Sequence, residues 1–171
     1  MQKLNWNSAA SQEDIAVIAA LGEEIWRQHY TQLLGKEQVD YMLEKYQSRE
    51  ALQKQLENGY TYWLIRWEGI PCGYCGFVRE GDRLFLSKLY LQERVRGKGI
   101  ARAVVEQLCR DAASQNLRAV YLTVNKYNTG SIGVYQKLGF QEIDAVETDI
   151  GHGFIMDDYI MELPIAEGKE F

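Results

Sequence analysis

Hydrophobic side chains in the first third of the chain recur every three or four positions, which is the spacing of one face of a helix. The clearest run covers residues 15–25 and follows Ser11, a helix-capping residue with an acidic residue three positions later. Gly35 interrupts this pattern, and two shorter apolar faces follow on either side of Ser48. The pattern therefore predicts three helices, the last of which ends at Asn58.

The spacing then changes to one typical of strands, with aromatic and β-branched residues over 60–67. Short turns separate this run from two more, over 70–79 and 84–91. Strands that follow one another through short turns pair with each other, so we expect these three to be antiparallel. Another short strand, over 2–6, is expected before the helices.

Helix and strand patterns alternate in the remainder of the chain. The predicted elements are a helix over 100–112, a strand over 119–124, a short helix over 128–138 and two strands over 140–147 and 154–163. This order predicts an α/β (α+β) fold in which a mixed central sheet includes an antiparallel meander. The chain has 171 residues and no internal repeat or linker, so we expect residues 1–171 to form a single domain.

The composition says little more about the fold, but it argues against some classes of function. The net charge of −5 argues against a nucleic-acid-binding protein, because such proteins usually present a basic face. The beginning of the chain lacks a signal-peptide pattern, and no apolar run approaches the ~20 residues that cross a membrane. The three cysteines are an odd number, which indicates free thiols in a reducing compartment. We therefore expect a cytoplasmic protein that binds neither nucleic acid nor a membrane.

The stretch RVRGKGIARAVVEQL, residues 94–108, combines two glycines and three cationic residues with the start of a helix. The first amides of a helix have no partner within it and carry partial positive charge, so they bind anions. Glycine has no Cβ and lets an anion approach the backbone. The sequence therefore predicts a phosphate-binding loop. Its residues are Arg94, Arg96, Gly97, Lys98, Gly99, Ile100 and Ala101.

Two familiar phosphate-binding motifs do not fit this loop. A dinucleotide fingerprint requires a third glycine where Arg102 stands, and an acidic residue at the end of the next strand where Asn125 stands. The nucleotide P-loop, G-x-x-x-x-G-K-[ST], has no match. These departures weigh against a nucleotide-binding module. On this segment alone, a basic loop that merely precedes a surface helix stays open as an alternative.

Residues 94–99 resemble the R/Q-x-x-G-x-G/A signature of the GNAT superfamily, the acyl-CoA-dependent N-acyltransferases. Residues 128–140 are similar to that family's N-x-x-A-x-x-x-Y-x-K-x-G-F pattern, with Ser131 in place of the usual alanine. The resemblance implies a single N-acetyltransferase domain with splayed fourth and fifth strands and helices on both faces of the sheet. It also implies acetyl-CoA (coenzyme A) as the cosubstrate and no metal. The N-terminal region is more weakly similar to the polyamine acetyltransferase branch.

The resemblance also assigns residues to the cofactor. It implies that the loop amides hold the diphosphate of coenzyme A, and that backbone groups at Leu89 and Leu91 bond the pantetheine and the thioester oxygen. Asn128 and Ser131 would contact the cofactor as well. Tyr135 falls on the family's tyrosine and would give a proton to the departing thiolate, because a phenol of pKa ~10 remains protonated at neutral pH. A core tyrosine without a chemical role is the alternative for Tyr135.

The acceptor side is less defined by sequence. The resemblance implies that His29 and Tyr30, near the end of the first predicted helix, line the acceptor pocket. The general base is not identified, and each acidic candidate is interpreted as a solvated surface charge. These candidates are Glu80, Asp82, Asp157 and Asp158. The expected acceptor is a primary amine of a small molecule, such as a polyamine, or of a peptide, which attacks acetyl-CoA directly in a ternary complex. A non-catalytic acyl-CoA sensor on the same fold is the alternative, and dimers are frequent in relatives, which makes a homodimer a candidate assembly.

Cys72 and Cys75 have the spacing that thiol–disulfide enzymes use. In those enzymes the motif begins a helix, but here it lies within a predicted strand next to Pro71 and Gly76. This position favours a structural role. Two cysteines and two distant histidines also lack the ligand spacing of a zinc site.

Overall fold

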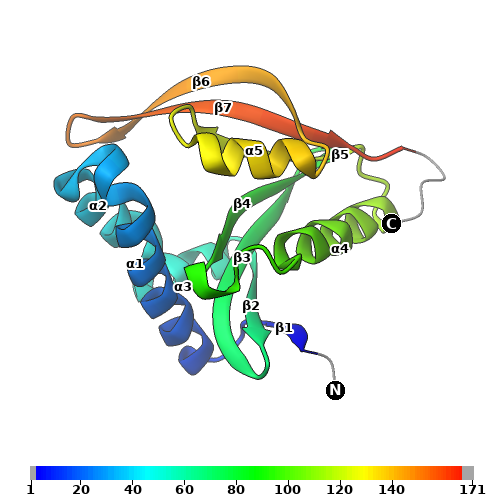
Figure 1. Cartoon of the computed structure of the whole chain (residues 1–171), viewed down its shortest axis with the longest axis horizontal. Coiled ribbons are helices and arrows are strands. Elements are labelled where there is room, and N and C mark those ends of the chain that lie inside the picture. The colour runs from blue at the N-terminus through cyan, green and yellow to red at the C-terminus, as the bar shows by residue number, and fades with distance from the viewer. Residues whose placement is uncertain (1–2, 167–171) are drawn as a thin grey trace. The chain divides into compact units, whose positions relative to one another are not determined.

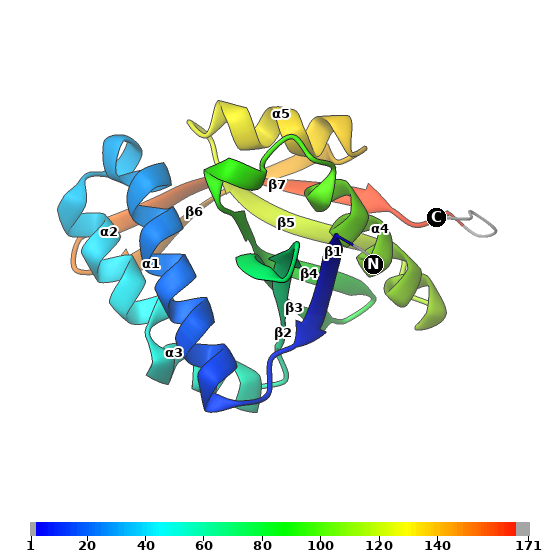
Figure 2. The same cartoon turned by 60° about the horizontal axis from the view of Figure 1, so that its bottom comes forward.

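The computed structural model describes residues 3–166, and its helices and strands follow the predicted order (Figures 1 and 2). The strands are β1 (Leu4–Ser8), β2 (Thr61–Trp67), β3 (Ile70–Glu80), β4 (Arg83–Leu91), β5 (Ala119–Asn125), β6 (Gln141–Gly151) and β7 (Phe154–Pro164). The helices are α1 (Gln12–Leu34), α2 (Lys36–Met42), the π-helix η1 (Leu43–Gln47), α3 (Arg49–Glu57), the 3-10 helix η2 (Glu93–Val95), α4 (Ile100–Ser114) and α5 (Thr129–Lys137). In this part of the chain, no helix is both long and apolar enough to cross a membrane.

The strands of the described region form a hydrogen-bonded sheet in the order β1-β2-β3-β4-β5-β7-β6. The pairs β1–β2 and β2–β3 are antiparallel, whereas β4 and β5 run parallel. The prediction of an α/β fold with a mixed sheet is therefore confirmed.

The chain divides into two compact units. Unit 1 contains the residues up to Val78 together with Lys88–Ile100, and unit 2 contains Arg79–Ser87 and the residues from Ala101 onward. β3 and β4 each contribute residues to both units as a result.

In unit 1 the helices begin where capping chemistry predicts. The Ser11 hydroxyl accepts a hydrogen bond of 3.1 Å from the backbone N–H of Asp14, and the Ser48 hydroxyl accepts one of 3.1 Å from Ala51. Gly35 ends α1 with a φ of 85°, which lies in the left-handed region. The apolar faces of these helices pack on β2 and β3. The buried residues of this core are Ala9, Ile15, Ile18, Leu21, Ile25, Leu52, Tyr62, Leu64 and Tyr74.

The segment after α2 differs from the predicted short helix, because residues Leu43–Gln47 form a π-helix. Such turns are rare and redirect the backbone groups they contain. Here the Tyr46 carbonyl and the Gln47 side chain both accept hydrogen bonds from the buried Lys88 of β4, at 2.7 and 2.6 Å. The irregular turn therefore serves a contact with a strand that lies far away in the sequence.

In unit 2 the beginning of β4 pairs in parallel with β5, from Arg83 opposite Ala119 to Phe85 opposite Tyr121. The rings of Phe85 and Tyr121 stack with centroids 4.8 Å apart, which adds side-chain packing to this short pairing. β5 pairs along its whole length with β7, which in turn pairs with β6. The carboxyl end of β5 is therefore held by β7.

β6 extends to Gly151, beyond the predicted end at 147, and forms a long hairpin with β7, orange and red in Figure 1. Pairing with β7 explains the extension, because Thr148 lies opposite Met156 and Asp149 opposite Ile155. β1 also differs from its prediction over 2–6. It covers Leu4–Ser8 and pairs with β2, and residue 2 lies outside the described range.

Candidate active site

The glycine-rich loop leads from β4 through η2 to α4, as the sequence predicts. Gly97 and Gly99 have φ angles of 78° and 79°, a conformation that residues with side chains rarely adopt. A Cβ placed on either glycine would meet nothing within 4 Å in the described structure, so the backbone is open here. α4 begins directly afterwards at Ile100, and its unpaired first amides follow this open backbone. The loop therefore has the local geometry of an anion site.

Three exposed basic side chains extend from the loop. Arg94 donates a hydrogen bond of 3.2 Å to the carbonyl of Pro71, and Arg96 donates one of 3.2 Å to the carbonyl of Leu91. A guanidinium has five N–H donors, more than these bonds use. Lys98 is exposed beside them. The loop thus combines an open backbone with positive charge.

The end of β4 lies beside α1 within unit 1. Leu89 and Leu91 flank Tyr90, and all three are partly exposed. The hydroxyl oxygens of Tyr90 and Tyr30 are 2.9 Å apart, and the His29 ring packs edge-on against the Tyr30 ring with centroids 4.7 Å apart. The structure therefore brings the predicted acceptor residues together with the part of β4 that is predicted to hold the cofactor.

His29 is electrostatically linked to the loop. Burial lowers the pKa of its imidazole below the usual 6.5, and the positive charge of Arg96 lowers it further. The ring is therefore neutral at pH 7 and can accept a hydrogen bond or a proton. No sequence pattern indicated this pairing of α1 with the loop.

In unit 2, α5 presents the residues of the second family motif. The Asn128 side chain accepts a hydrogen bond of 3.3 Å from the backbone N–H of Ser131 and so caps the helix. None of the residues of α5 itself is fully buried. Tyr135 is partly exposed, with its ring centroid 5.6 Å from that of Phe140, so it is not a core tyrosine. Its chemical role stays a prediction.

Asp158 departs from the expected solvated charge, because only 6% of its surface is exposed. Burial raises the pKa of its carboxyl to about 6; the charge of Asp157 raises it further and that of Lys126 opposes the rise. Its Oδ1 atom has no hydrogen-bond partner among the described residues. The sequence-based interpretation was wrong for Asp158, because alternation along a strand cannot reveal what covers each face.

The other acidic candidates have polar partners. Asp82 forms an ion pair of 2.7 Å with Arg118, and Asp157 forms one of 2.8 Å with Lys126. Glu80 accepts a hydrogen bond from the hydroxyl of Tyr121. Among the described residues Asp158 differs from these three, because it is buried and no ion pair with it is formed.

Cys72 and Cys75 lie in β3, buried and without a disulfide, as the strand interpretation predicts. Burial raises the pKa of both thiols, which keeps them protonated. Because the thiolate is the nucleophile in thiol–disulfide exchange, this environment favours the structural role.

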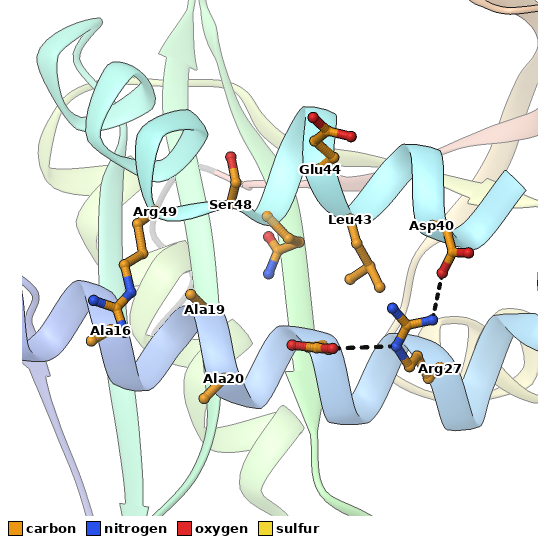
Figure 3. Close-up of a pocket in the computed structure, with 11 residues that line it drawn as sticks. Ala16, Ala19, Ala20, Arg27, Asp40, Leu43, Glu44, Ser48 and Arg49 are labelled. Atoms are coloured by element: carbon orange, nitrogen blue, oxygen red, sulfur yellow. Dashed lines mark hydrogen bonds and ion pairs between the residues drawn. The ribbon is translucent and has the colours of Figure 1, made fainter. Parts of the chain in front are cut away.

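A separate hollow of about 380 Å³ lies between α1 and the segment that contains η1 (Figure 3). Ala16, Ala19 and Ala20 form its wall on α1, and Arg27 and Asp40 form an ion pair of 2.6 Å at its edge. None of the predicted site residues lines it. It is therefore distinct from the loop and strand ends described above.

The sequence profile of the Acetyltransferase (GNAT) family matches residues 19–140. This match covers more than half of the chain and contains the glycine loop and the segment from Asn128 to Phe140. The chain belongs to the GNAT family. The resemblance inferred from the two motifs is thereby confirmed.

Several relatives match part of the chain. The uncharacterized N-acetyltransferase YjgM of Escherichia coli (strain K12) is 29% identical over 107 residues, which are 60% of this chain and 64% of that protein. The spermine/spermidine N(1)-acetyltransferase of Bacillus subtilis (strain 168) is 30% identical over 63 residues, which are 36% of this chain and 41% of that protein. The matched regions thus span less than two thirds of the length of these relatives.

The fold is shared more widely than the sequence. The PaiA N-acetyltransferase of Thermoplasma acidophilum, crystallised in complex with coenzyme A, matches with a TM-score of 0.80 at 19% identity. The alignment covers 95% of this chain and 99% of that chain. The GNAT fold predicted from the motifs is confirmed by this match.

Proposed function

We propose that this chain is an acyl-CoA-dependent N-acetyltransferase that moves an acetyl group from acetyl-CoA to a primary amine. Residues 1–171 would act as one catalytic domain, and the amine would attack directly while both substrates are bound. Membership of the GNAT family supports the reaction class. The observation that carries the proposal is the left-handed backbone of Gly97 and Gly99 directly before α4.

The loop fits the diphosphate of coenzyme A. Its open glycine backbone admits an anion, and the first amides of α4, at Ile100 and Ala101, can donate hydrogen bonds to it. Arg94, Arg96 and Lys98 would add charge. When bound, acetyl-CoA supplies the acetyl group as a thioester. The loop offers backbone amides and three cationic side chains together, so it suits a diphosphate such as that of coenzyme A better than a sulfate-sized ion.

Backbone groups of β4 would orient the remainder of the cofactor. We assign Leu89 to the thioester carbonyl and Leu91 to the pantetheine, because both lie at the strand end that leads into the loop. A backbone N–H aimed at an oxygen that gains negative charge typically lowers a barrier by a few kcal/mol. Leu89 would act in this way.

The second family motif would contact the cofactor from α5. Asn128 and Ser131 stand in its first turn, and a Cβ at Gly130 or Gly133 would meet nothing within 4 Å in the described structure. This open helix surface would accommodate a ligand. Tyr135 would hold the proton that the sulfur receives.

The acceptor would be a cationic amine, for which polyamines are one class. His29 and Tyr30 would line its pocket, beside the end of β4. The net charge of −5 favours approach of a cation, and the partial likeness to a spermine/spermidine acetyltransferase supports the same class. Peptide amines are the competing class.

Thiol release from acetyl-CoA across a panel of amines tests the proposal. The panel contains spermidine, free amino acids, an aminoglycoside and peptides, with Gly97→Val as the loop control. We expect release with at least one amine, and loss of acetyl-CoA binding in Gly97→Val because a β-branched residue cannot adopt the φ of 78° without strain. Tight acetyl-CoA binding without turnover on any amine would favour the non-catalytic sensor instead.

Tyr135→Phe tests the proposed proton donor. Removing a general acid typically costs 10²–10⁴-fold in rate, so we expect turnover to fall about 100-fold while acetyl-CoA affinity stays within about threefold. Tyr127→Phe is the matched control, since that side chain is 69% exposed on the turn before α5. Equal turnover of Tyr135→Phe and wild type at saturating substrates would contradict the assignment.

The same proposal places the enzyme in the cytoplasm, where thiols stay reduced, because Cys72 and Cys75 are buried in β3 and form no disulfide. A homodimer is proposed as its assembly. Size-exclusion chromatography with light scattering checks the latter.

A further inference from the structure

Asp158 has a defined position at the carboxyl end of β5. It lies on β7 directly opposite Asn125, the last residue of β5, and opposite Val146 of β6 on its other side. Directly paired residues of antiparallel strands have their side chains on the same face with Cβ atoms ~5 Å apart. The Asp158 carboxylate is therefore held next to the Asn125 side chain.

This end of β5 is a place where ligands bind in α/β sheets. β5 is the strand that runs parallel to β4, and ligands bind at the carboxyl ends of parallel strands in open sheets. After Asn125, whose Oδ1 accepts a hydrogen bond of 2.9 Å from the N–H of Tyr127, the chain reaches Asn128 and α5. Asp158 thus shares a strand end with the helix that carries Tyr135.

The carboxylate of Asp158 is buried but not satisfied. Only 6% of the residue is exposed, yet Oδ1 has no hydrogen-bond donor in the described structure. Proteins pair nearly all buried polar atoms, because an unpaired buried charge is costly. A cationic amine would bring both hydrogen-bond donors and the compensating charge.

We propose that Asp158 binds the ammonium group of the acceptor and takes up one of its protons before acetyl transfer. This inference rests on the proposed function. The ammonium R–NH₃⁺ and the carboxylate become R–NH₂ and a carboxylic acid. The N–C bond then forms as the C–S bond breaks, and the second nitrogen proton balances the one that the sulfur receives. Asp158 returns its proton to solvent, so each turnover releases one proton.

The environment of Asp158 suits this exchange. Burial disfavours both the ammonium and the carboxylate, so a desolvated ion pair gives way more easily to the neutral amine and acid. The pKa of Asp158 is raised to about 6, which leaves the group ionised at pH 7.5 and a better proton acceptor than an ordinary aspartate. An exposed carboxylate on this hairpin would lack both properties.

Two charged neighbours shift the pKa of Asp158 in opposite directions. Asp157 raises the pKa of Asp158 and Lys126 lowers it, and these two form an ion pair of 2.8 Å. On β6, Asp144 pairs with Ile160 two positions along the same face. Substitutions of Asp157 and Lys126 should therefore move the titration of Asp158 without removing its carboxylate.

Asp158→Asn in the full-length protein tests the inference with the most reactive amine of the panel. We expect acetyl-CoA affinity within about threefold of wild type and turnover at pH 7.5 reduced about 100-fold, the usual effect of losing a general base. In wild type, kcat/KM should decrease as the pH is lowered and Asp158 becomes protonated. This pH dependence should be absent in the variant. The rate of the variant should recover as pH approaches the pKa of the acceptor's ammonium group, because the amine then loses its proton to solvent.

Asp157→Asn and Lys126→Met are the matched controls. Each should keep turnover within about threefold at its optimum, but the acid limb should move to lower pH in Asp157→Asn and to higher pH in Lys126→Met. If Asp158 had a purely structural role, substitutions of its two charged neighbours would not move the acid limb of the pH–rate profile in opposite directions. Unchanged limbs in both variants would contradict the assignment.

Failure of the two proposals can be told apart. If wild type binds no acetyl-CoA and releases no thiol with any amine, the proposed function and this inference both fall. If wild type turns over and Asp158→Asn matches it at pH 7.5, only the inference falls. Should Asp158→Asn not fold, the carboxyl carbon of Asp158 in wild type is titrated by NMR with and without the acceptor. A signal that the amine does not shift would overturn the inference.

Discussion

Lys88 in unit 1 and Asp158 in unit 2 are the two charged side chains that are buried within residues 3–166, at 7% and 6% exposure. Their surroundings differ. Lys88 Nζ donates to Tyr46 O at 2.7 Å, Gln47 Oε1 at 2.6 Å and Gln55 Oε1 at 3.2 Å, whereas Asp158 Oδ1 has no donor. An ammonium has three N–H donors, so Lys88 is satisfied by the protein itself.

This difference separates a structural charge from a candidate binding group. Burial moves both groups toward their neutral forms, lowering the pKa of Lys88 to about 7 and raising that of Asp158 to about 6. Only Asp158 has an oxygen that a ligand can satisfy. Lys88 instead connects β4 to η1 and α3, which accounts for the π-helical turn at Leu43–Gln47. A perturbed pKa alone does not distinguish the two roles; the hydrogen-bond partners do.

The largest expected effect is that of Lys88→Ala. The substitution leaves a cavity and removes one buried and two partly buried hydrogen bonds. Leaving a buried group unsatisfied costs about 1–3 kcal/mol, and the cavity adds to this loss. We expect the free energy of unfolding to fall by at least about 3 kcal/mol, measured by urea denaturation at pH 7.5. Lys54→Ala, on the exposed surface of α3, is the control and should change it little. A small loss for Lys88→Ala would mean that Lys88 is not a structural element.

The pH dependence of stability should have opposite signs for the two groups. The folded protein binds the Asp158 proton more tightly than the unfolded chain, so ionisation of Asp158 lowers stability as pH rises from about 4 to about 6. Two pKa units correspond to about 2–3 kcal/mol. Asp158→Asn should therefore match wild type near pH 4 and exceed its stability by about that amount at pH 7.5, measured by thermal and urea unfolding.

For Lys88 the sign is reversed. The unfolded chain holds the lysine proton more tightly, so stability should rise with pH between about 7 and about 10. Lys88→Met should remove this rise. A parallel increase in wild type and Lys88→Met would contradict the comparison.

A smaller effect is expected from Gly22→Ala, which tests the packing around Lys88. A Cβ at Gly22 of α1 would overlap Nε2 of Gln47, which donates a hydrogen bond of 2.6 Å to the Tyr74 hydroxyl. Displacing Gln47 disturbs its bonds to both Tyr74 and Lys88. We expect a loss of about 1–2 kcal/mol in the free energy of unfolding.

Gly133→Ala on α5 is the matched control for Gly22→Ala. A Cβ there meets nothing within 4 Å in the described structure, so alanine should raise stability by up to about 1 kcal/mol through its helix propensity. The same substitution should therefore have opposite signs in the two helices. Equal effects would show that the contact at Gly22 relaxes without cost.

Much of the fold was predictable because its signals are local. Ser11, Ser48 and Asn128 cap helices through backbone groups three residues away, and Gly97 and Gly99 adopt the backbone that only glycine takes easily. The two motifs that indicate the GNAT family are equally local. Predicted element boundaries were wrong where strand pairing decides them. The end of β6 is an example, because its polar residues continue the strand through pairing with β7.

The sequence by itself determined the order of helices and strands, the glycine loop before α4 and the family, because each depends on residues a few positions apart. The tertiary structure decided that Asp158 is buried with an unpaired oxygen, that Lys88 is buried with three acceptors, and that residues Leu43–Gln47 form a π-helix. Burial depends on which distant segments cover a side chain. Asp157 is therefore partly exposed and ion-paired with Lys126, whereas the neighbouring Asp158 is buried.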